Sequence, residues 1–196
     1  MTARESILAD VRRNHPSARA LPVAPHFRSA ASVDLKEKFA AALKQMAGET
    51  IPECPADVGR FIAARFPTAK NFYSTAREFT GNCTAASFGN WAGPATVDVT
   101  VVRAPLGVAE TGSVLLSESE LVVNTVGFLA HDIVVLLDPA DIVENIHDAY
   151  RHRYFRESGY CVLMTGPSGS GDISGVVVHP AQASKTLTVI FVPRTK

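Results

Sequence analysis

The chain has 196 residues, about one and a third times the usual domain length, so a single domain with a sizeable core is expected. Lysine plus arginine and aspartate plus glutamate both number 19, which gives a formal net charge of zero. This balance argues against nucleic acid as a main partner, because phosphate binding depends on accumulated positive charge. Charged residues make up 19% of the chain, a low content that fits much buried sheet or a surface covered by a partner.

The cysteines are odd in number, widely spaced and free of any CxxC pair: Cys54, Cys83 and Cys161. They predict neither an iron–sulfur cluster nor a zinc site, and the six histidines show no ligand spacing, so we expect no metal and no cofactor. The polar N-terminus lacks the apolar core of a signal peptide, and the longest uncharged stretch, 79–97, is interrupted by Gly, Asn and Pro. We therefore expect a cytoplasmic protein without a membrane span.

The first third of the chain predicts helices and an extended arm. Capping patterns at Thr2 and Asp34 and apolar residues at helical spacing predict helices over about 3–13, from Asp34 to Gly48, and over 55–66. Three prolines make residues 14–30 an arm. Residues 1–30 hold too few apolar side chains to fold alone, so we expect them to pack on the main domain, 31–196, or on a neighbouring subunit of a homo-oligomer.

The remainder predicts an α/β sheet. Apolar, β-branched runs predict strands at 97–103, 113–117, 132–137, 160–164, 176–178 and 187–192. Asp138 and Pro139 favour a helix start, so a helix is expected over 139–152. Strand, helix and strand in this order predict a βαβ unit, with 132–137 and 160–164 parallel in one sheet and joined by a right-handed crossover.

Two loops carry candidate chemistry. Residues 165–172 follow a buried strand and are rich in Gly and Ser, so backbone N–H groups near Gly166, Ser168 and Ser170 can form an anion site. The loop matches neither a Walker motif nor a dinucleotide fingerprint, and a tight, solvated turn is the alternative. In the second loop, 107–113, Glu110 is the only acid, and it is either a general base or nucleophile at a strand end or an exposed turn glutamate.

The long Gly- and Asn-rich connection over 79–97 is a third candidate. It carries Trp91, the only tryptophan of the chain. A connection of this length is typical of a lid or a binding loop, whereas ordinary packing of Trp91 and Phe88 onto the core is the alternative.

Three segments together resemble the LUD-domain family, of the lactate-utilisation protein C type. Residues 104–116 resemble its A-x-x-G-I-A-E-T-G-T-L-V-L segment, and 131–149 resemble a strand and helix of that family. Residues 165–173 resemble its T-G-P-S-R-[TS]-A-D-I-E segment, with matches at Thr165, Gly166, Pro167, Ser168, Ser170, Asp172 and Ile173. The resemblance covers about 97–192. Gly169 replaces the family's arginine, Gly171 its alanine and Ser174 its glutamate, and a following G-V-H-G-P is missing.

The resemblance implies a three-layer α/β/α sandwich with a mixed, largely parallel sheet, like that of the NagB/RpiA/CoA-transferase group. It also implies a role in oxidising L-lactate to pyruvate beside iron–sulfur partner proteins, which would hold the clusters that this chain lacks ligands for. The expected site is a small-anion pocket between the two loops, formed by Glu110, Thr111, Gly112, Thr165, Gly166, Ser168, Ser170 and Asp172. One alternative is a stand-alone isomerase or transferase acting on a phosphorylated or CoA-linked substrate through Glu110. Another is an interaction module whose pocket has lost its ligand.

Overall fold

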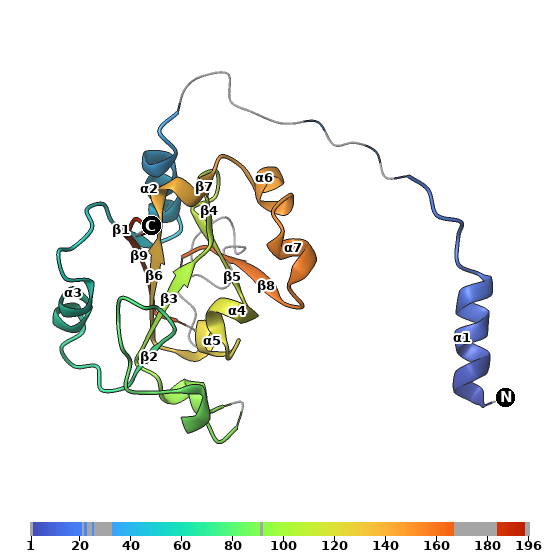
Figure 1. Cartoon of the computed structure of the whole chain (residues 1–196), viewed down its shortest axis with the longest axis horizontal. Helices are drawn as coiled ribbons and strands as arrows, with labels where there is room; N and C mark the ends of the chain where they lie inside the picture. Colours follow the sequence, from blue (N-terminus) through green and yellow to red (C-terminus); the bar gives the residue numbers. More distant parts are fainter. Residues whose placement is uncertain are drawn as a thin grey trace.

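A computed structural model describes residues 2–20, 22, 25, 33–90, 92–166 and 184–194. A mostly parallel central sheet is flanked by helices, so the predicted α/β/α class is confirmed (Figure 1). The α-helices are α1 (Ala3–Arg13), α2 (Leu35–Gln45), α3 (Val58–Arg65), α4 (Glu118–Leu121), α5 (Val126–Leu129), α6 (Ile146–Tyr150) and α7 (Tyr154–Glu157). The strands are β1 (Glu49–Ile51), β2 (Phe72–Ser74), β3 (Val99–Ala104), β4 (Leu106–Val108), β5 (Ser113–Ser117), β6 (Asp132–Leu137), β7 (Ile142–Val143), β8 (Cys161–Met164) and β9 (Thr186–Phe191).

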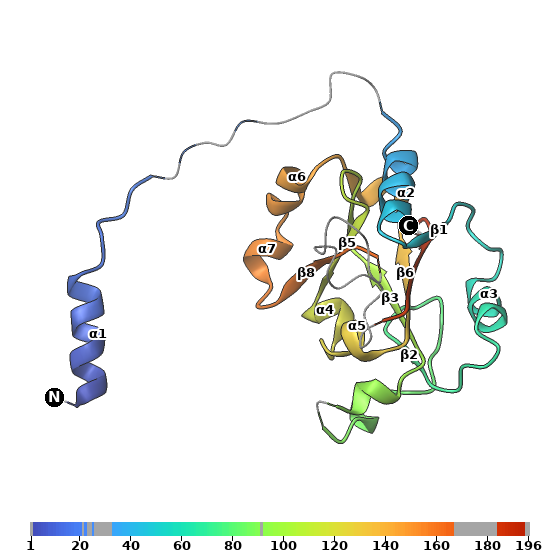
Figure 2. The ribbon, with the colours of Figure 1, turned by 180° about the vertical axis from the view of Figure 1, so that it is seen from behind.

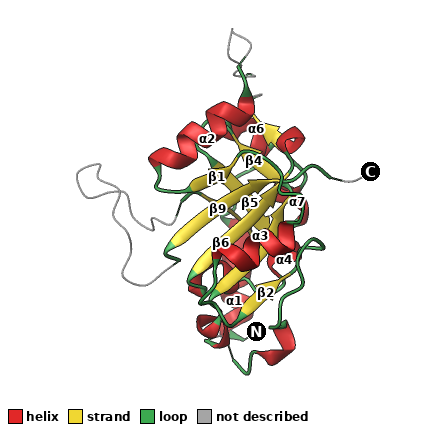
Figure 3. Cartoon of the chain, turned by 90° about the vertical axis from the view of Figure 1, so that its left-hand side faces the viewer, coloured by secondary structure: helices red, strands yellow, loops and turns green. Residues whose placement is uncertain are grey.

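The central sheet has the strand order β1-β9-β6-β3-β2 and is parallel throughout. Figure 3 shows β1, β9 and β6 side by side. Because successive side chains of a strand point to opposite faces, the buried residues of β6 divide between two cores. Val134 and Leu136 pack with Ile62 of α3, whereas Val135 and Leu137 pack with Phe39 of α2. Both faces of the sheet are therefore covered, as a parallel sheet requires.

A second, smaller sheet has the order β7-β4-β5-β8 and is mixed. Pro105 alone separates β3 from β4, so the chain passes directly from the central sheet into this one. β4 and β5 form an antiparallel hairpin, with Val108 opposite Ser113. Leu115 and Leu106 of this sheet pack with Ala149 of α6, and Figure 1 shows α6 and α7 on the side of the molecule away from α3.

The predicted βαβ unit between 132 and 164 is wrong. β6 belongs to the central sheet, whereas β8 belongs to the second sheet and pairs antiparallel with β5. Asp138 does cap, since its side chain accepts a hydrogen bond from Ala140 N, but it starts only a 3₁₀ turn, Pro139–Asp141. Ile142–Val143 then forms β7 beside β4, because β-branched residues gain more from pairing and burial than from a continued helix. The described strands between 97 and 192 therefore belong to two sheets rather than one.

The predicted helices of the first third are present. α1 starts with the predicted Thr2–Glu5 capping box, and Asp34 caps α2 by accepting from Lys36 N and Glu37 N. Residues 2–20 are all exposed, and α1 lies apart from the α/β domain (Figures 1 and 2). The arm was predicted to pack on the main domain or on a neighbouring subunit. The structure shows no burial of residues 2–20 on the domain, and packing on a neighbouring subunit stays a prediction.

The 79–97 connection packs on the core in the part that the structure describes. The Phe88 ring lies 5.6 Å from the Tyr73 ring, and the Phe79 ring lies 5.5 Å from that of Phe72, measured between centroids. These contacts favour ordinary packing of the phenylalanines. Trp91 lies outside the described residues, as does the predicted strand at 176–178.

Candidate functional site

The loop of the β4–β5 hairpin holds three of the predicted site residues, Glu110, Thr111 and Gly112. Gly112 N donates to Val108 O at 2.9 Å, which closes the loop. Gly112 has φ +67°, and a Cβ on it would overlap the backbone nitrogen of Leu43 and lie 2.6 Å from the Leu43 Cα. A glycine is required here, because α2 crosses the loop too closely for any side chain.

The loop that follows β8 meets the same helix. Gly166 has φ +60°, and a Cβ on it would overlap the carbonyl oxygen of Met46, the residue that ends α2. Gly112 and Gly166, one from each predicted loop, therefore lie against the C-terminal half of α2, although 53 residues lie between them in the sequence.

Hydroxyl groups join the two loops directly. Thr111 Oγ1 and Ser113 Oγ lie 2.6 Å apart, and Ser113 Oγ is hydrogen bonded in turn to Thr165 Oγ1. Ser113 is 3% exposed. The structure thus brings Thr111, Gly112, Thr165 and Gly166 together. Ser168, Ser170 and Asp172 lie outside the described residues.

Glu110 is exposed at the tip of the hairpin. Its Oε2 accepts a hydrogen bond from Ile146 N, the first residue of α6, at 3.0 Å, and Glu110 N donates to Glu144 O at 3.1 Å. The carboxylate therefore holds the hairpin to the start of α6, where the unpaired N–H groups of a helix favour negative charge. This contact is a structural role that the sequence did not predict.

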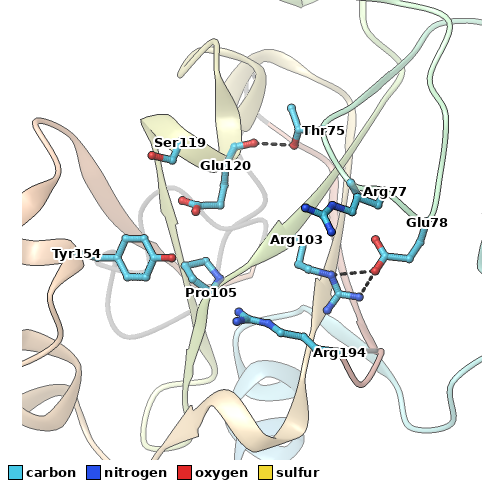
Figure 4. Close-up of a pocket in the computed structure, with 10 residues that line it drawn as sticks. Thr75, Arg77, Glu78, Arg103, Pro105, Ser119, Glu120, Tyr154 and Arg194 are labelled. Atoms are coloured by element: carbon cyan, nitrogen blue, oxygen red, sulfur yellow. Dashed lines mark hydrogen bonds and ion pairs between the residues drawn. The ribbon is translucent and has the colours of Figure 1, made fainter. Parts of the chain in front are cut away.

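A separate pocket of about 420 Å³ lies where strands of the central sheet end. β2, β3 and β9 are followed by the lining residues Thr75, Pro105 and Arg194, respectively, so the pocket occupies the carboxyl edge of the parallel sheet. Open α/β sheets bind their ligands at this edge. We call it the arginine pocket, and its lining residues are Thr75, Ala76, Arg77, Glu78, Arg103, Pro105, Ser119, Glu120, Tyr154 and Arg194 (Figure 4).

Two of the three arginines are held by the fold. Arg103 Nε donates to Glu78 Oε1 at 3.0 Å, and Arg103 Nη1 donates to the carbonyl oxygen of Val192 at 3.0 Å. Arg194 Nη2 lies 2.9 Å from Asp141 Oδ2. Arg77 is exposed, and the described part of the chain offers its guanidinium no hydrogen-bond or ion-pair partner.

Two aspartates that contact Arg194, Asp138 and Asp141, have pKa values shifted in opposite directions. Burial raises the pKa of Asp141 by more than the Arg194 guanidinium lowers it. At Asp138, burial acts in the same direction, but hydrogen bonds from the backbone N–H groups of Arg194 and Ala140 outweigh it and leave the pKa below its usual value. Arg194 is therefore fixed in place by its backbone as well as by its side chain.

Sequence reasoning missed the arginine pocket, and the residues that form it explain why. Its lining comes from short segments after β2, β3 and β9 and from α4 and α7, which only the fold brings together. One signal was available: Arg103 is the only charged residue within the apolar run of β3. A charge in a buried strand requires a partner or a function.

The described residues lack two kinds of feature. They contain no group of three or more His, Cys, Asp or Glu side chains placed to hold a metal ion. None of their helices combines the length and the apolar character needed to cross a membrane.

The described residues define an α/β protein with a pocket at the carboxyl edge of its parallel sheet. The LUD-domain family model matches residues 93–192, and the chain belongs to that family. A crystal structure of a DUF162-family protein from Deinococcus radiodurans is similar in fold, with a TM-score of 0.62 and 12% sequence identity, covering 81% of this chain and 96% of that one. A search of curated proteins gave no match.

Proposed function

We propose that this protein is a subunit or accessory protein of a cytoplasmic lactate-utilisation system, in which L-lactate is oxidised to pyruvate beside iron–sulfur partner proteins. Membership of the LUD-domain family, which is associated with lactate utilisation, supports the proposal. So do the scattered, free thiols Cys54, Cys83 and Cys161, because the clusters of such a system would then belong to its partners. A fold of the NagB/RpiA/CoA-transferase type is part of the same proposal.

The hydrogen bond between Ser113 and Thr165 is the observation that carries the proposed site. It joins the two segments that resemble family motifs, so their loops border one another on α2. In the hairpin loop, Glu110 N and Gly112 N are already hydrogen bonded, so the backbone N–H groups proposed to attract the anion are those of the glycine-rich 165–172 loop. Thr111 adds a hydroxyl to this border. The proposed ligand is a small carboxylate or phosphate, held weakly at about millimolar affinity because the family's arginine is replaced by Gly169.

The proposal assigns Glu110 to this site as well, where its exposed carboxylate would orient the ligand or take its proton. Glu110→Gln separates that role from the structural one, because an amide oxygen still accepts from Ile146 N while the charge is lost. Glu53→Gln is the matched control, since Glu53 is exposed and lies outside both loops.

The experiment is complementation of a deletion strain for growth on L-lactate, with copurification as a second readout. We expect the wild type and Glu53→Gln to restore growth and to copurify with iron–sulfur proteins, and Glu110→Gln to restore growth poorly. Full growth with Glu110→Gln would remove the carboxylate from the mechanism. Unimpaired growth of the deletion strain itself would refute the lactate role, and substrate turnover by the isolated chain would support the alternative of a stand-alone isomerase or transferase.

A further inference from the structure

We propose that the arginine pocket binds a small organic anion, a carboxylate or phosphate ester, whose carbon chain carries hydroxyl groups. This site is distinct from the two-loop site. Pro105 lines the pocket, whereas Glu110 lies beyond the other end of β4, a strand about 10 Å long. The volume of about 420 Å³ lies within the range of roughly 300–1,000 Å³ that is usual for small-molecule sites.

The donors that the fold leaves unused indicate an anionic ligand. Arg77, Ser119 and Tyr154 all line the pocket, and none of their side-chain polar groups has a hydrogen-bond partner among the residues that the structure describes. Figure 4 shows the Arg77 guanidinium and the Tyr154 hydroxyl directed toward the pocket from different elements. A guanidinium presents a planar fork of donors that matches a carboxylate or a phosphate, and the paired arginines beside it add positive potential.

The acids of the pocket restrict which anion fits. Arg103 compensates the charge of Glu78, whose Oε2 is nevertheless buried without a hydrogen-bond partner among the described residues. The Glu120 carboxylate also lines the space (Figure 4), and its Oε2 accepts from Ser117 N at 3.0 Å. Carboxylates repel a bare anion but accept hydrogen bonds from hydroxyl groups. A ligand with one anionic end and several hydroxyls satisfies both sets of groups.

The test is isothermal titration calorimetry of the full chain with ribose-5-phosphate, D-gluconate, inorganic phosphate and neutral ribose. We expect at least one of the two hydroxylated anions to bind at least about tenfold more tightly than ribose and inorganic phosphate. Tighter binding of ribose-5-phosphate would identify a phosphate ester as the ligand class, and tighter binding of gluconate a carboxylate.

Substitutions then locate the site. Arg77→Gln breaks no hydrogen bond or ion pair among the described residues and is expected to weaken binding about tenfold or more. Arg60→Gln is the matched control, because Arg60 is an exposed arginine of α3 outside the pocket, and it is expected to bind like the wild type. Tyr154→Phe removes only the hydroxyl and is expected to weaken binding by a smaller factor.

Three results would overturn the proposal: no binding of either hydroxylated anion at about 10 mM, equal binding by Arg77→Gln and wild type, or binding of inorganic phosphate or neutral ribose as tight as that of the better hydroxylated anion. The titrations use neither lactate nor a Glu110 variant. Their failure would therefore leave the lactate-growth result standing, and failure of that growth experiment would leave the pocket titrations standing.

Discussion

Gly112→Ala is expected to be one of the most destabilising single changes in the chain. An L-residue at φ +67° costs about 1–2 kcal/mol, and the new Cβ would also overlap the backbone of α2 at Leu43. The helix must then shift, which disturbs Phe39 and Leu43, both fully buried. Forcing an extra methyl group into a packed site costs about 1–3 kcal/mol more. The sum is about 2–5 kcal/mol, a large part of the 5–15 kcal/mol that is typical of a whole domain.

Urea unfolding followed by far-ultraviolet circular dichroism measures this loss, and a fall in Tm of about 5–15 °C is expected in parallel. Gly89→Ala is the matched control, because a Cβ there meets no atom within 4 Å and φ lies outside the left-handed region. It is expected to change the free energy of unfolding by less than about 0.5 kcal/mol. If Gly112→Ala is as stable as Gly89→Ala, the close approach of α2 to the hairpin loop is wrong.

Three further predictions concern the fold. The Asp98 carboxylate accepts hydrogen bonds from the backbone N–H groups of Lys70 and Asn71, which hold its pKa below the usual value. The stability that the ionised carboxylate adds is therefore complete above about pH 4 and is lost as the pH falls through the lowered pKa. Asp98→Asn is expected to show a shallower acid loss of the urea midpoint than the wild type, and identical pH profiles would contradict this. Leu43→Ala is expected to lower the free energy of unfolding in urea by about 2–5 kcal/mol because Leu43 is fully buried. Leu8→Ala on the exposed helix α1 is expected to lower it far less, and equal losses would refute the burial argument. Removal of residues 1–20 is expected to leave Tm unchanged within about 2 °C and to weaken self-association in gel filtration, and global unfolding of the shortened chain would show that α1 is part of the domain.

Local chemistry was readable in the sequence wherever the residues involved are close neighbours in the chain. The capping box at Thr2 and the cap at Asp34 start the predicted helices, and the apolar runs at 113–117 and 132–137 form strands with the predicted bounds. Each of these features is decided within a few residues, by side-chain hydrogen bonds or by an apolar pattern. The class of fold is confirmed, although the βαβ unit from which the patterns predicted an α/β sheet is wrong, and the three-layer sandwich was what the family resemblance implied.

The two predicted loops have features that the local sequence shows and features that depend on distant parts of the chain. Their glycines were visible in the sequence, but the close approach of α2, which leaves no room for a Cβ at Gly112 or Gly166, involves residues far away in the chain. The adjacency of Ser113 and Thr165 likewise follows from the antiparallel pairing of β5 with β8. The sequence predicted instead that β8 runs parallel to β6 in one sheet. Which strands pair depends on the apolar surface that the whole fold buries, and a local pattern does not contain this information.

The sequence by itself thus determined the positions of most helices and strands and the resemblance to the LUD-domain family, which implied the α/β/α sandwich. Tertiary structure alone decided that Ile142–Val143 forms a strand, that the strands divide into two sheets, and that Arg77, Arg103 and Arg194 meet in one pocket. The physical reason is the same in each case. Parallel strands bring their carboxyl ends together regardless of their distance in the chain, so residues that share no local motif become neighbours at one edge of the sheet.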